Sequence, residues 1–502
     1  MEKKVQKLPY VAFFLLIFGF LFLWFAKIHP LIPFDGDDWT YLAYVRLATP
    51  IWGEWNPSKV FPEVLYPLFS TFAAYALTPL TGDYITAQTL MHAFVVSAAI
   101  TGYLWCFACL MRRLFSCSLT TTAVLTTLFF ALHFLVFRTG EENNMYLFLC
   151  VSLNCYYNYL LPMLLNASLV MLLLANQRMG AFLKSGKPEI RGLLYVIVYL
   201  AIFSNLAASG ILAAYAGSCL LLELIRIGKG FRFRAFVREH RFHLGILAAW
   251  LISAVFELSG GRAGDAMAGG TLLGRLHMTC FLLKSALLES NRLFLISSGI
   301  VVGSALVCML LSGGVRSLGP KLASVLGTFL ISTAAVFVYM ILLCAAVDPA
   351  KITACEYLFA IYFHILLLVL LALGYLAGRC PNLMLALPLL LLFLVYSINT
   401  RGNTFRDSNT CGLPPERCAA LSRYIVKQFQ EADAAGQQEM TLYLPQFTAD
   451  PENGDNWPYT LFLVERIPGT LYEHGVTKQL IDITPVIDPA VNAQLNIPLP
   501  AK

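Results

Sequence analysis

The fold is decided by the stretch Pro9–Ala26, PYVAFFLLIFGFLFLWFA, which follows the cations Lys3, Lys4 and Lys7. An uninterrupted apolar run of this length crosses the hydrocarbon core of a bilayer as a helix. The sequence after it holds no small-residue cleavage site of the kind that ends a signal peptide. We therefore expect the run to be a retained membrane anchor with the N-terminus in the cytoplasm.

The rest of the chain repeats this pattern. Of 502 residues, 58% are hydrophobic and 13% are charged, whereas soluble domains carry roughly 25% charged residues. The net charge of +6 is spread over loops and indicates no nucleic-acid partner. The sequence predicts an all-α polytopic membrane protein with about eleven transmembrane helices. They are expected near residues 9–28, 85–111, 117–137, 158–176, 193–207, 210–225, 243–258, 293–312, 322–346, 357–377 and 383–398.

The charges of the connections alternate between the two sides. By the positive-inside rule, the cation-rich connections are cytoplasmic, so the C-terminus is extracytoplasmic. The chain carries no organelle signal, and a multi-pass protein of a bacterial plasma membrane is expected. The inner cations are Arg112, Arg113, Arg178, Lys184, Lys187, Arg191, Arg226, Lys229, Arg232, Arg234, Arg238, Arg241, Arg316, Lys321 and Arg379. The outer acids are Asp35, Asp37, Asp38, Glu54, Glu63, Asp83, Glu141, Glu142, Glu257, Asp265, Glu289, Asp348 and Glu356.

One apolar run does not fit this alternation. Glu63–Leu80 contains Pro67 and Pro79, is amphipathic, and would invert every later connection if it crossed the membrane. We therefore expect the first outer loop, residues 29–84, to hold helices that lie in the interface or dip into it.

Three carboxylates open this loop within PFDGDDWTY, residues 33–41. Asp35, Asp37 and Asp38 are followed by the aromatic residues Trp39 and Tyr41. Carboxylates this close repel one another, which raises a pKa or recruits a cation. At a membrane face they can hold a divalent cation, take a proton from a nucleophile, or simply be solvated, and the sequence leaves the metal open.

Other outer residues form a set of candidate substrate contacts. Some have plain alternatives: the tyrosines and asparagines at helix ends suit an interface belt, and the glycine-rich loop around Arg262 suits either a phosphate clamp or a flexible loop. Asn205 lies in a brief turn, Ser204–Gly210, expected to sink into the protein or to be an ordinary hairpin. The set comprises Trp39, Tyr41, Lys59, Glu63, Arg138, Glu141, Glu142, Tyr157, Asn158, Asn205, Arg262 and Lys351.

Cysteines and nucleotide motifs point to no cofactor. Most of the thirteen cysteines lie in apolar runs, and so does the one pair with CxxC spacing, Cys106 and Cys109; no Cys/His metal spacing occurs. No Walker-type phosphate loop is present, which argues against a cytoplasmic ATP site. Cys411 and Cys418 lie in a polar stretch, where a bridge between them is an open alternative in an oxidising compartment.

The chain changes character after the last expected span. Residues 1–400 are predicted to form the membrane domain and residues 401–502 a small extracytoplasmic α/β unit. Pro415–Ala435 has helical spacing of apolar residues and is followed by Gly436. Met440–Pro445 and Tyr459–Val464 are predicted to be short strands.

The motif Asp37-Asp38-Trp39-x-Tyr41, placed just after the first span, resembles the GT-C superfamily of integral-membrane glycosyltransferases. This superfamily includes protein O-mannosyltransferases, aminoarabinose transferases and bacterial Gtr-type glucosyltransferases. The resemblance covers the layout of residues 8–400. It implies that Asp37 is the catalytic base, with Asp38 or Asp35 next, and that Glu141 or Glu142 supplies a second acidic element.

The resemblance also implies the reaction. A polyprenyl-phosphate sugar would be the donor, and a cell-envelope glycan, lipid or protein the acceptor. A carboxylate base would contribute about 10²–10⁴-fold to the rate, and Arg138, Arg262 or Lys351 would stabilise the leaving phosphate. A single displacement would invert the anomeric centre. The alternatives are a polysaccharide polymerase, or a transporter or flippase of a lipid-linked saccharide.

Overall fold

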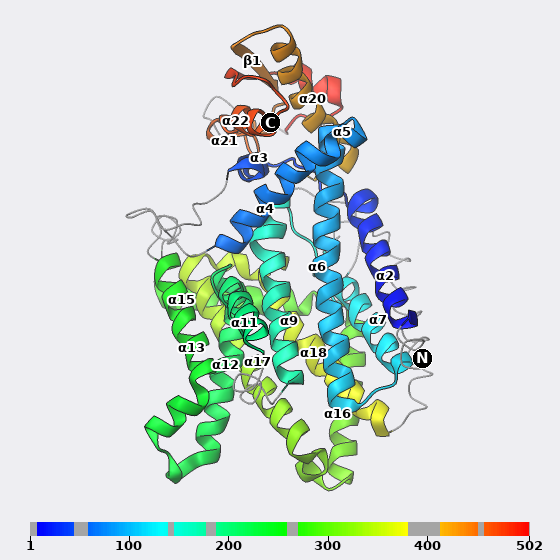
Figure 1. Cartoon of the computed structure of the whole chain (residues 1–502), viewed down its shortest axis with the longest axis vertical. Coiled ribbons are helices and arrows are strands. Elements are labelled where there is room, and N and C mark those ends of the chain that lie inside the picture. Colours follow the sequence, from blue (N-terminus) through cyan, green and yellow to red (C-terminus); the bar gives the residue numbers. More distant parts are fainter. Residues whose placement is uncertain are drawn as a thin grey trace.

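The computed structural model describes residues 8–44, 59–138, 145–176, 187–258, 270–379, 412–449 and 456–500. Long helices form a bundle, and the C-terminal segment covers one end of it (Figure 1). Within these ranges, eight helices are long and apolar enough to cross a membrane. The predicted helical multi-pass architecture is confirmed at this level. The last expected span, residues 383–398, lies outside the described residues.

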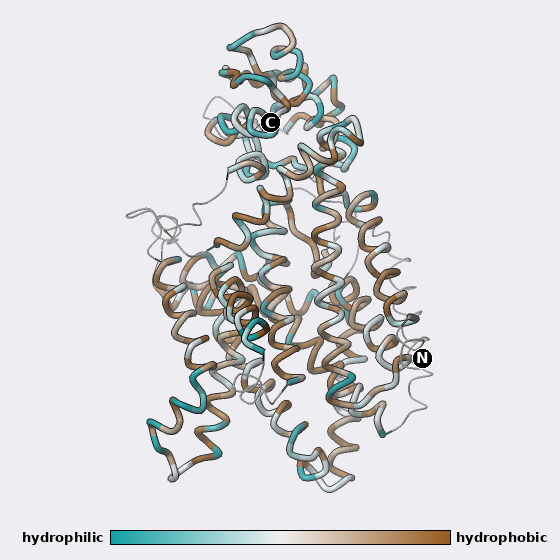
Figure 2. Tube along the Cα trace, viewed as in Figure 1, coloured by the Kyte–Doolittle hydropathy of each residue, from teal (hydrophilic) through white to brown (hydrophobic). Residues whose placement is uncertain are grey.

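The bundle helices follow the expected order along the chain. Figure 2 shows hydrophobic residues along the bundle and hydrophilic residues gathered toward its two ends. The helices are α2 (Leu8–Leu23), continued by η1 (Trp24–Ile28), α6 (Tyr84–Phe115), α7 (Leu119–Leu135), α8 (Leu153–Cys155), η3 (Tyr156–Leu160), α9 (Leu161–Ala175), α11 (Pro188–Ile202), α12 (Leu206–Ile227), α13 (Phe233–Leu258), α16 (Arg292–Leu311), α17 (Gly319–Val347) and α18 (Cys355–Arg379).

The helices differ in how much of their surface the protein covers. In α18 and in the α8–α9 segment, most residues are buried, whereas in α16 only 11% are buried. Leu306 and Leu310 of α16 are 50% and 67% exposed, although the helix is apolar around its whole circumference. A helix that is apolar on all sides and exposed on most of them is suited to contact lipid. The core therefore lies around α6, α9 and α18.

The two ends of the bundle carry different residues. At one end, which we call the basic end, Lys321 Nζ donates to the carbonyl oxygen of Arg113 at 2.8 Å. Arg379 at the end of α18 approaches Ser312 and the backbone of Ser317 there. The opposite end of α6 begins beside the C-terminal segment and α3 (Gly36–Ala43), and we call it the α3 end.

The helical segment of the first loop, which was predicted to lie in the interface, lies across the α3 end. It comprises α4 (Val60–Phe72), η2 (Ala73–Leu77) and α5 (Thr78–Thr81), and Figure 1 shows α4 running obliquely below α3. Lys59, the N-cap of α4, contacts the ends of α11 and α13. Its backbone N–H donates to Phe203 O, and its ammonium pairs with Glu257. Farther along, Tyr75 donates to the carbonyl of Glu473. Both ends therefore lie at one end of the bundle, although the segment is long enough to cross a membrane.

One helix was not expected. Residues 259–292 were predicted to be a connection, but α15 (Leu272–Leu288) is helical. Its end packs against the end of α7, where Arg138 N donates to Glu289 O and Asn291 N to Val136 O, both at 2.8 Å. The prediction missed it because Arg275 and Lys284 interrupt its apolar pattern.

The C-terminal unit is built around a two-stranded parallel sheet. The predicted helix and first strand are confirmed as α20 (Pro415–Ala434) and β1 (Glu439–Leu444). The predicted strand Tyr459–Val464 is wrong, since Leu461–Val464 form helix α21 and the partner strand is β2 (Asp482–Ile487). A short apolar run does not distinguish a buried strand from a buried helical turn. The unit is completed by α22 (Ile467–Glu473) and α23 (Pro489–Leu495).

Candidate functional site

The acidic cluster forms the first turn of α3, and two of its carboxylates hold that turn together. Asp35 is the N-cap of α3, and its Oδ1 accepts from Asp37 N at 3.2 Å. Asp38 Oδ2 accepts in return from the backbone of Phe34 and Asp35, at 3.1 and 3.0 Å. This is a capping box, in which the side chains satisfy backbone N–H groups that the helix leaves open. Asp35 and Asp38 are buried.

Asp38 also joins α3 to the helix that follows α7. Its Oδ1 accepts from Asn154 N at 2.6 Å, within the short helix α8. Asn158 of η3 donates to Asn154 Oδ1 at 2.6 Å and so belongs to the same contact. Burial raises the pKa of Asp38 above its usual range, and the charge of Asp35 adds to this, while the three N–H donors oppose it.

Asp37 differs from both neighbours because its side chain is partly exposed. The structure therefore separates three adjacent carboxylates into two that order the chain and one that is accessible. Of the two aromatic residues beside them, Trp39 is fully buried and Tyr41 is partly exposed. Trp39 is therefore placed as a packing residue.

The C-terminal unit covers α3 through contacts to its backbone. Ser422 donates to Pro33 O, Tyr459 to Phe34 O and Thr470 to Trp39 O, each at 2.6 Å. No local sequence pattern indicates these contacts, because they join residues 389 to 431 positions apart. The acidic turn is thus built by both ends of the chain.

A buried polar and aromatic group lies between α4, α6 and η3. Tyr66 and Tyr157 stack with ring centroids 4.5 Å apart. His92 Nδ1 is 2.7 Å from Tyr157 Oη, and Gln88 is 3.2 Å from the other ring nitrogen. Tyr66 Oη is buried with no hydrogen-bond partner, and Tyr66 interacts electrostatically with Asp38. Of these residues, only Tyr157 was a predicted contact. The sequence did offer one indication of this group. Gln88 and His92 are polar residues four positions apart in an apolar run, so they lie on one face of a membrane helix.

Several predicted contacts lie with other partners. Lys59 Nζ pairs with Glu257 at 3.6 Å. Glu63, one helical turn after Lys59, is buried. Arg138 lies 3.9 Å from Glu289, and Asn205 caps α12 by accepting from Ala207 N. Lys351 lies in η6 (Pro349–Thr353), which packs against α15.

The turn that holds Asn205 is buried, as one of the two predictions for it required. Tyr339 donates to the carbonyl of Leu206 beside it at 2.7 Å, so this backbone is covered by protein. Glu141, Glu142, Arg262 and Cys411 lie outside the described residues. Cys418 is buried in α20.

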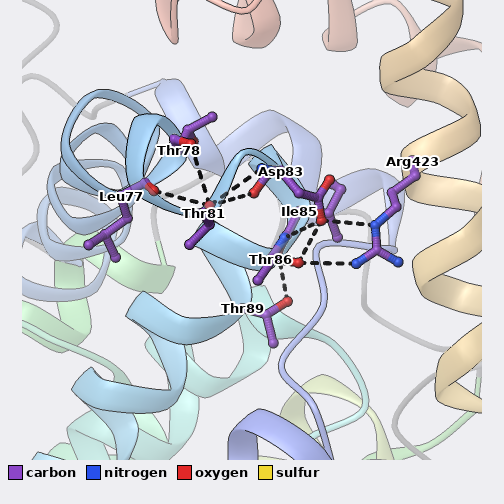
Figure 3. A network of polar contacts seen from close by, with 8 residues as sticks. All are labelled: Leu77, Thr78, Thr81, Asp83, Ile85, Thr86, Thr89 and Arg423. Atoms are coloured by element: carbon purple, nitrogen blue, oxygen red, sulfur yellow. Dashed lines mark hydrogen bonds and ion pairs between the residues drawn. The ribbon is translucent and has the colours of Figure 1, made fainter.

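A second polar cluster joins α20 to the start of α6 (Figure 3). Arg423 Nε donates to Asp83 Oδ2 at 2.9 Å, and its Nη2 donates to Thr86 Oγ1 at 3.1 Å. Thr86 in turn donates to Asp83 Oδ2 at 2.6 Å. Burial raises the pKa of Asp83. The hydrogen bonds from Thr86 and Arg423, together with the positive charge of Arg423, outweigh burial and hold that pKa below its usual value.

A cavity of about 290 Å³ lies beside this cluster, between the end of α2, the start of α6 and α20. Lys27 and Arg423 are the cations that line it, together with the carboxylate Glu416 and the hydroxyls of Thr86 and Thr89. Arg423 is adjacent to Ser422, which bonds the acidic loop, so the cavity and the acidic turn share one supporting helix. Sequence reasoning assigned neither cation to a site.

Metal ligation was left open by the sequence. Within the described ranges, no group of three or more His, Cys, Asp or Glu side chains is arranged to hold a metal ion.

Comparisons of the chain with protein-family models, curated proteins and solved structures return no match.

Proposed function

We propose that this chain is a membrane glycosyltransferase that moves a sugar from a polyprenyl-phosphate donor to a cell-envelope acceptor, with Asp37 as general base. The observation that carries the proposal is the division of labour in the acidic turn. The carboxylates of Asp35 and Asp38 accept hydrogen bonds from backbone N–H groups, whereas Asp37 lies beside them and is partly exposed. A partly exposed carboxylate on an ordered turn is suited to act as a general base.

The position of this turn supports the proposal. It lies at the α3 end, and Lys321, Arg113 and Arg379 gather at the opposite end. If the basic end is cytoplasmic, as the positive-inside rule indicates, the acidic turn lies on the extracytoplasmic side. A polyprenyl donor keeps its tail in lipid and its sugar at the membrane surface, which is the level proposed for α3 and α4.

In the proposed step, Asp37 accepts the proton of the acceptor hydroxyl as its oxygen bonds the anomeric carbon. The bond from that carbon to the donor phosphate oxygen breaks, and the phosphate leaves with the electron pair. A single displacement inverts the anomeric centre. The negative charge gathers on the phosphate, and we assign its stabilisation to Lys27 and Arg423, the two cations that line the cavity beside α20.

The test uses membranes that contain the full chain and a panel of radiolabelled polyprenyl-phosphate hexoses. We expect wild type to transfer label to endogenous acceptor, and Asp37→Asn to reduce the rate by about 10²-fold or more. Asp482→Asn is the matched control, since it changes an exposed aspartate of the same end. Unchanged transfer by a folded Asp37→Asn variant would remove Asp37 from the mechanism.

A transporter or flippase of a lipid-linked saccharide is the second candidate. It is favoured by the buried group formed by Gln88, His92 and Tyr157, because polar side chains inside membrane helices often line a transport path. A flux of labelled lipid-linked saccharide across proteoliposomes without a covalent product would support it. A polysaccharide polymerase would instead require two lipid-linked substrates for the transfer.

A further inference from the structure

A cavity of about 640 Å³ opens at the basic end, between α9, α12, α13 and α17. Its buried lining is mainly apolar, with Leu173, Leu174 and Val325, and includes the hydroxyl of Thr328. Its exposed lining carries the cations Arg226 and Lys321. The cavity is thus apolar in its depth and positively charged at its rim. These surfaces are complementary to a molecule that has an apolar part and an anionic group.

The two cations are held at the rim by named partners. Arg226 Nη1 donates to Glu223 Oε2 at 2.8 Å, and the remaining N–H groups of a guanidinium can serve another acceptor. Lys321 Nζ donates to the carbonyl oxygen of Arg113 at 2.8 Å, which positions the ammonium between α6 and α17. Glu223 is the acid of the described lining, and its charge is offset by Arg226.

The start of α17 adds a second attraction for an anion. Pro320, Lys321 and Ser324, from the first turns of this 29-residue helix, all line the cavity. The N-terminus of a helix carries partial positive charge and backbone N–H groups without intrahelical partners. Such termini bind phosphate, sulfate and carboxylate groups in proteins.

The arginine-rich start of α13 lies next to the same cavity. His240 and His243 line it, and α13 is kinked at His240, where φ is −105° and ψ is 17°. The turns before the kink carry the exposed residues Arg234 and Arg238. Basic pockets between membrane helices, with further cations beside them, are typical of sites for anionic lipid headgroups.

We propose that this cavity binds a phosphate ester, and that its apolar depth selects the phosphate of a membrane lipid over a soluble phosphate. Arg226, Lys321 and the start of α17 would hold the phosphate, and the leucine-lined depth would hold the adjoining hydrocarbon. The site is at the opposite end of the bundle from Asp37, so it does not depend on the glycosyl transfer proposed above.

The test measures binding to the purified full chain in nonionic detergent, with short-chain phosphatidic acid, inorganic phosphate and the matching uncharged diacylglycerol as three separate probes. Phosphatidic acid is expected to bind saturably and diacylglycerol to bind far more weakly. In Arg226→Gln/Lys321→Gln, affinity for phosphatidic acid should fall by about 30-fold, from about 1 kcal/mol for each cation. Both residues are exposed, so the variant should keep the elution profile and thermal unfolding of wild type.

The matched control is Lys284→Gln/Arg292→Gln, which removes an exposed lysine and arginine outside the cavity. Its affinity should equal that of wild type. If inorganic phosphate binds as tightly as phosphatidic acid with the same loss in the cavity variant, the phosphate site stands and its source is a soluble ester. If neither probe binds, or if both double variants lose affinity equally, the proposal is overturned.

Discussion

Asp37 and Asp38 are adjacent, yet the structure gives them different roles. Asp38 accepts from three backbone N–H groups through both carboxyl oxygens, whereas Asp37 is partly exposed. In Asp38→Asn the amide nitrogen cannot accept, so at least one buried N–H loses its partner. We expect the free energy of unfolding to fall by about 1–3 kcal/mol. Asp37→Asn should stay within about 0.5 kcal/mol of wild type.

Thermal unfolding of the purified proteins in one detergent distinguishes these outcomes. Transfer activity should be lost in Asp37→Asn at wild-type stability. Equal destabilisation by the two substitutions would contradict the assignment of Asp38 as the structural carboxylate.

Asp38 also predicts a pH dependence. Burial and the charge of Asp35 hold the pKa of Asp38 above its usual value, so the folded chain keeps a proton that the unfolded chain has lost. This contribution to stability is complete below the ordinary carboxyl pKa of about 3.9 and is lost as pH rises through the folded pKa. The stability difference between wild type and Asp38→Asn should therefore shrink as pH increases. A difference that grows with pH in the unfolding midpoints would show that Asp38 is stabilised as the anion.

The sequence showed the acidic cluster but not this division of roles. Three carboxylates in four positions are visible in any reading, and so is their place after the first span. Which of them is buried depends on Ser422, Tyr459 and Thr470, whose contacts with the loop come from the far end of the chain. Periodicity carries no information about contacts at such separations.

At the scale of elements, the packing of α20 on the start of α6 depends on the pair of Asp83 and Arg423. Their side chains are 33% and 49% exposed, so solvent screens the pair and its loss should cost at most about 1 kcal/mol. Asp83→Asn or Arg423→Gln should speed amide hydrogen exchange in α20. Lys427→Gln is the matched control, since Lys427 pairs with Glu431 of the same helix.

The same pair gives the element an acid sensitivity. The pKa of Asp83 is held below its usual value, so its contribution is present above the ordinary carboxyl pKa and is lost as pH falls through the folded value. The protection of α20 amides, corrected for the pH dependence of intrinsic exchange, should therefore fall at low pH in wild type and change less in Asp83→Asn. The reverse order of the two proteins would contradict the role given to Asp83.

The contact between α3 and α21 depends on a residue without a side chain. A Cβ at Gly36 would lie 2.6 Å from the carbonyl oxygen of Pro458 and 2.7 Å from Leu463. Gly36→Ala should therefore separate the C-terminal unit from α3 and destabilise the protein by about 1–3 kcal/mol. Limited proteolysis should cut the C-terminal unit of this variant sooner. Gly19→Ala is the control, since its Cβ would meet no atom within 4 Å.

Sequence patterns located the elements unevenly. The long apolar helices could be predicted because their apolar runs are long enough to span a membrane, and α20 because its apolar residues recur at helical spacing. The sequence predicts a strand at Tyr459–Val464, but its apolar residues Leu461–Val464 fit either structure and form a helix. Helix α15 was missed because Arg275 and Lys284 break its apolar run, and its place was decided by packing against α17 and η6.

At the scale of the whole molecule, charge separates the two ends of the bundle. The exposed arginines at the start of α13 are at the basic end, and the C-terminal unit covers the α3 end (Figure 1). The positive-inside rule then orients the molecule with the basic end in the cytoplasm. This orientation is a prediction from charge, and the proposed transfer on the extracytoplasmic side depends on it.

Labelling in sealed right-side-out vesicles tests the orientation. In a background with all thirteen cysteines replaced, a membrane-impermeant maleimide should label Lys478→Cys directly, because this exposed position belongs to the C-terminal unit. Arg234→Cys, exposed at the basic end, should react only after the vesicles are opened. The reverse pattern would place Asp37 in the cytoplasm and would remove an extracytoplasmic polyprenyl-phosphate sugar as its substrate. Labelling of both positions in sealed vesicles would show that the two ends do not lie on opposite sides.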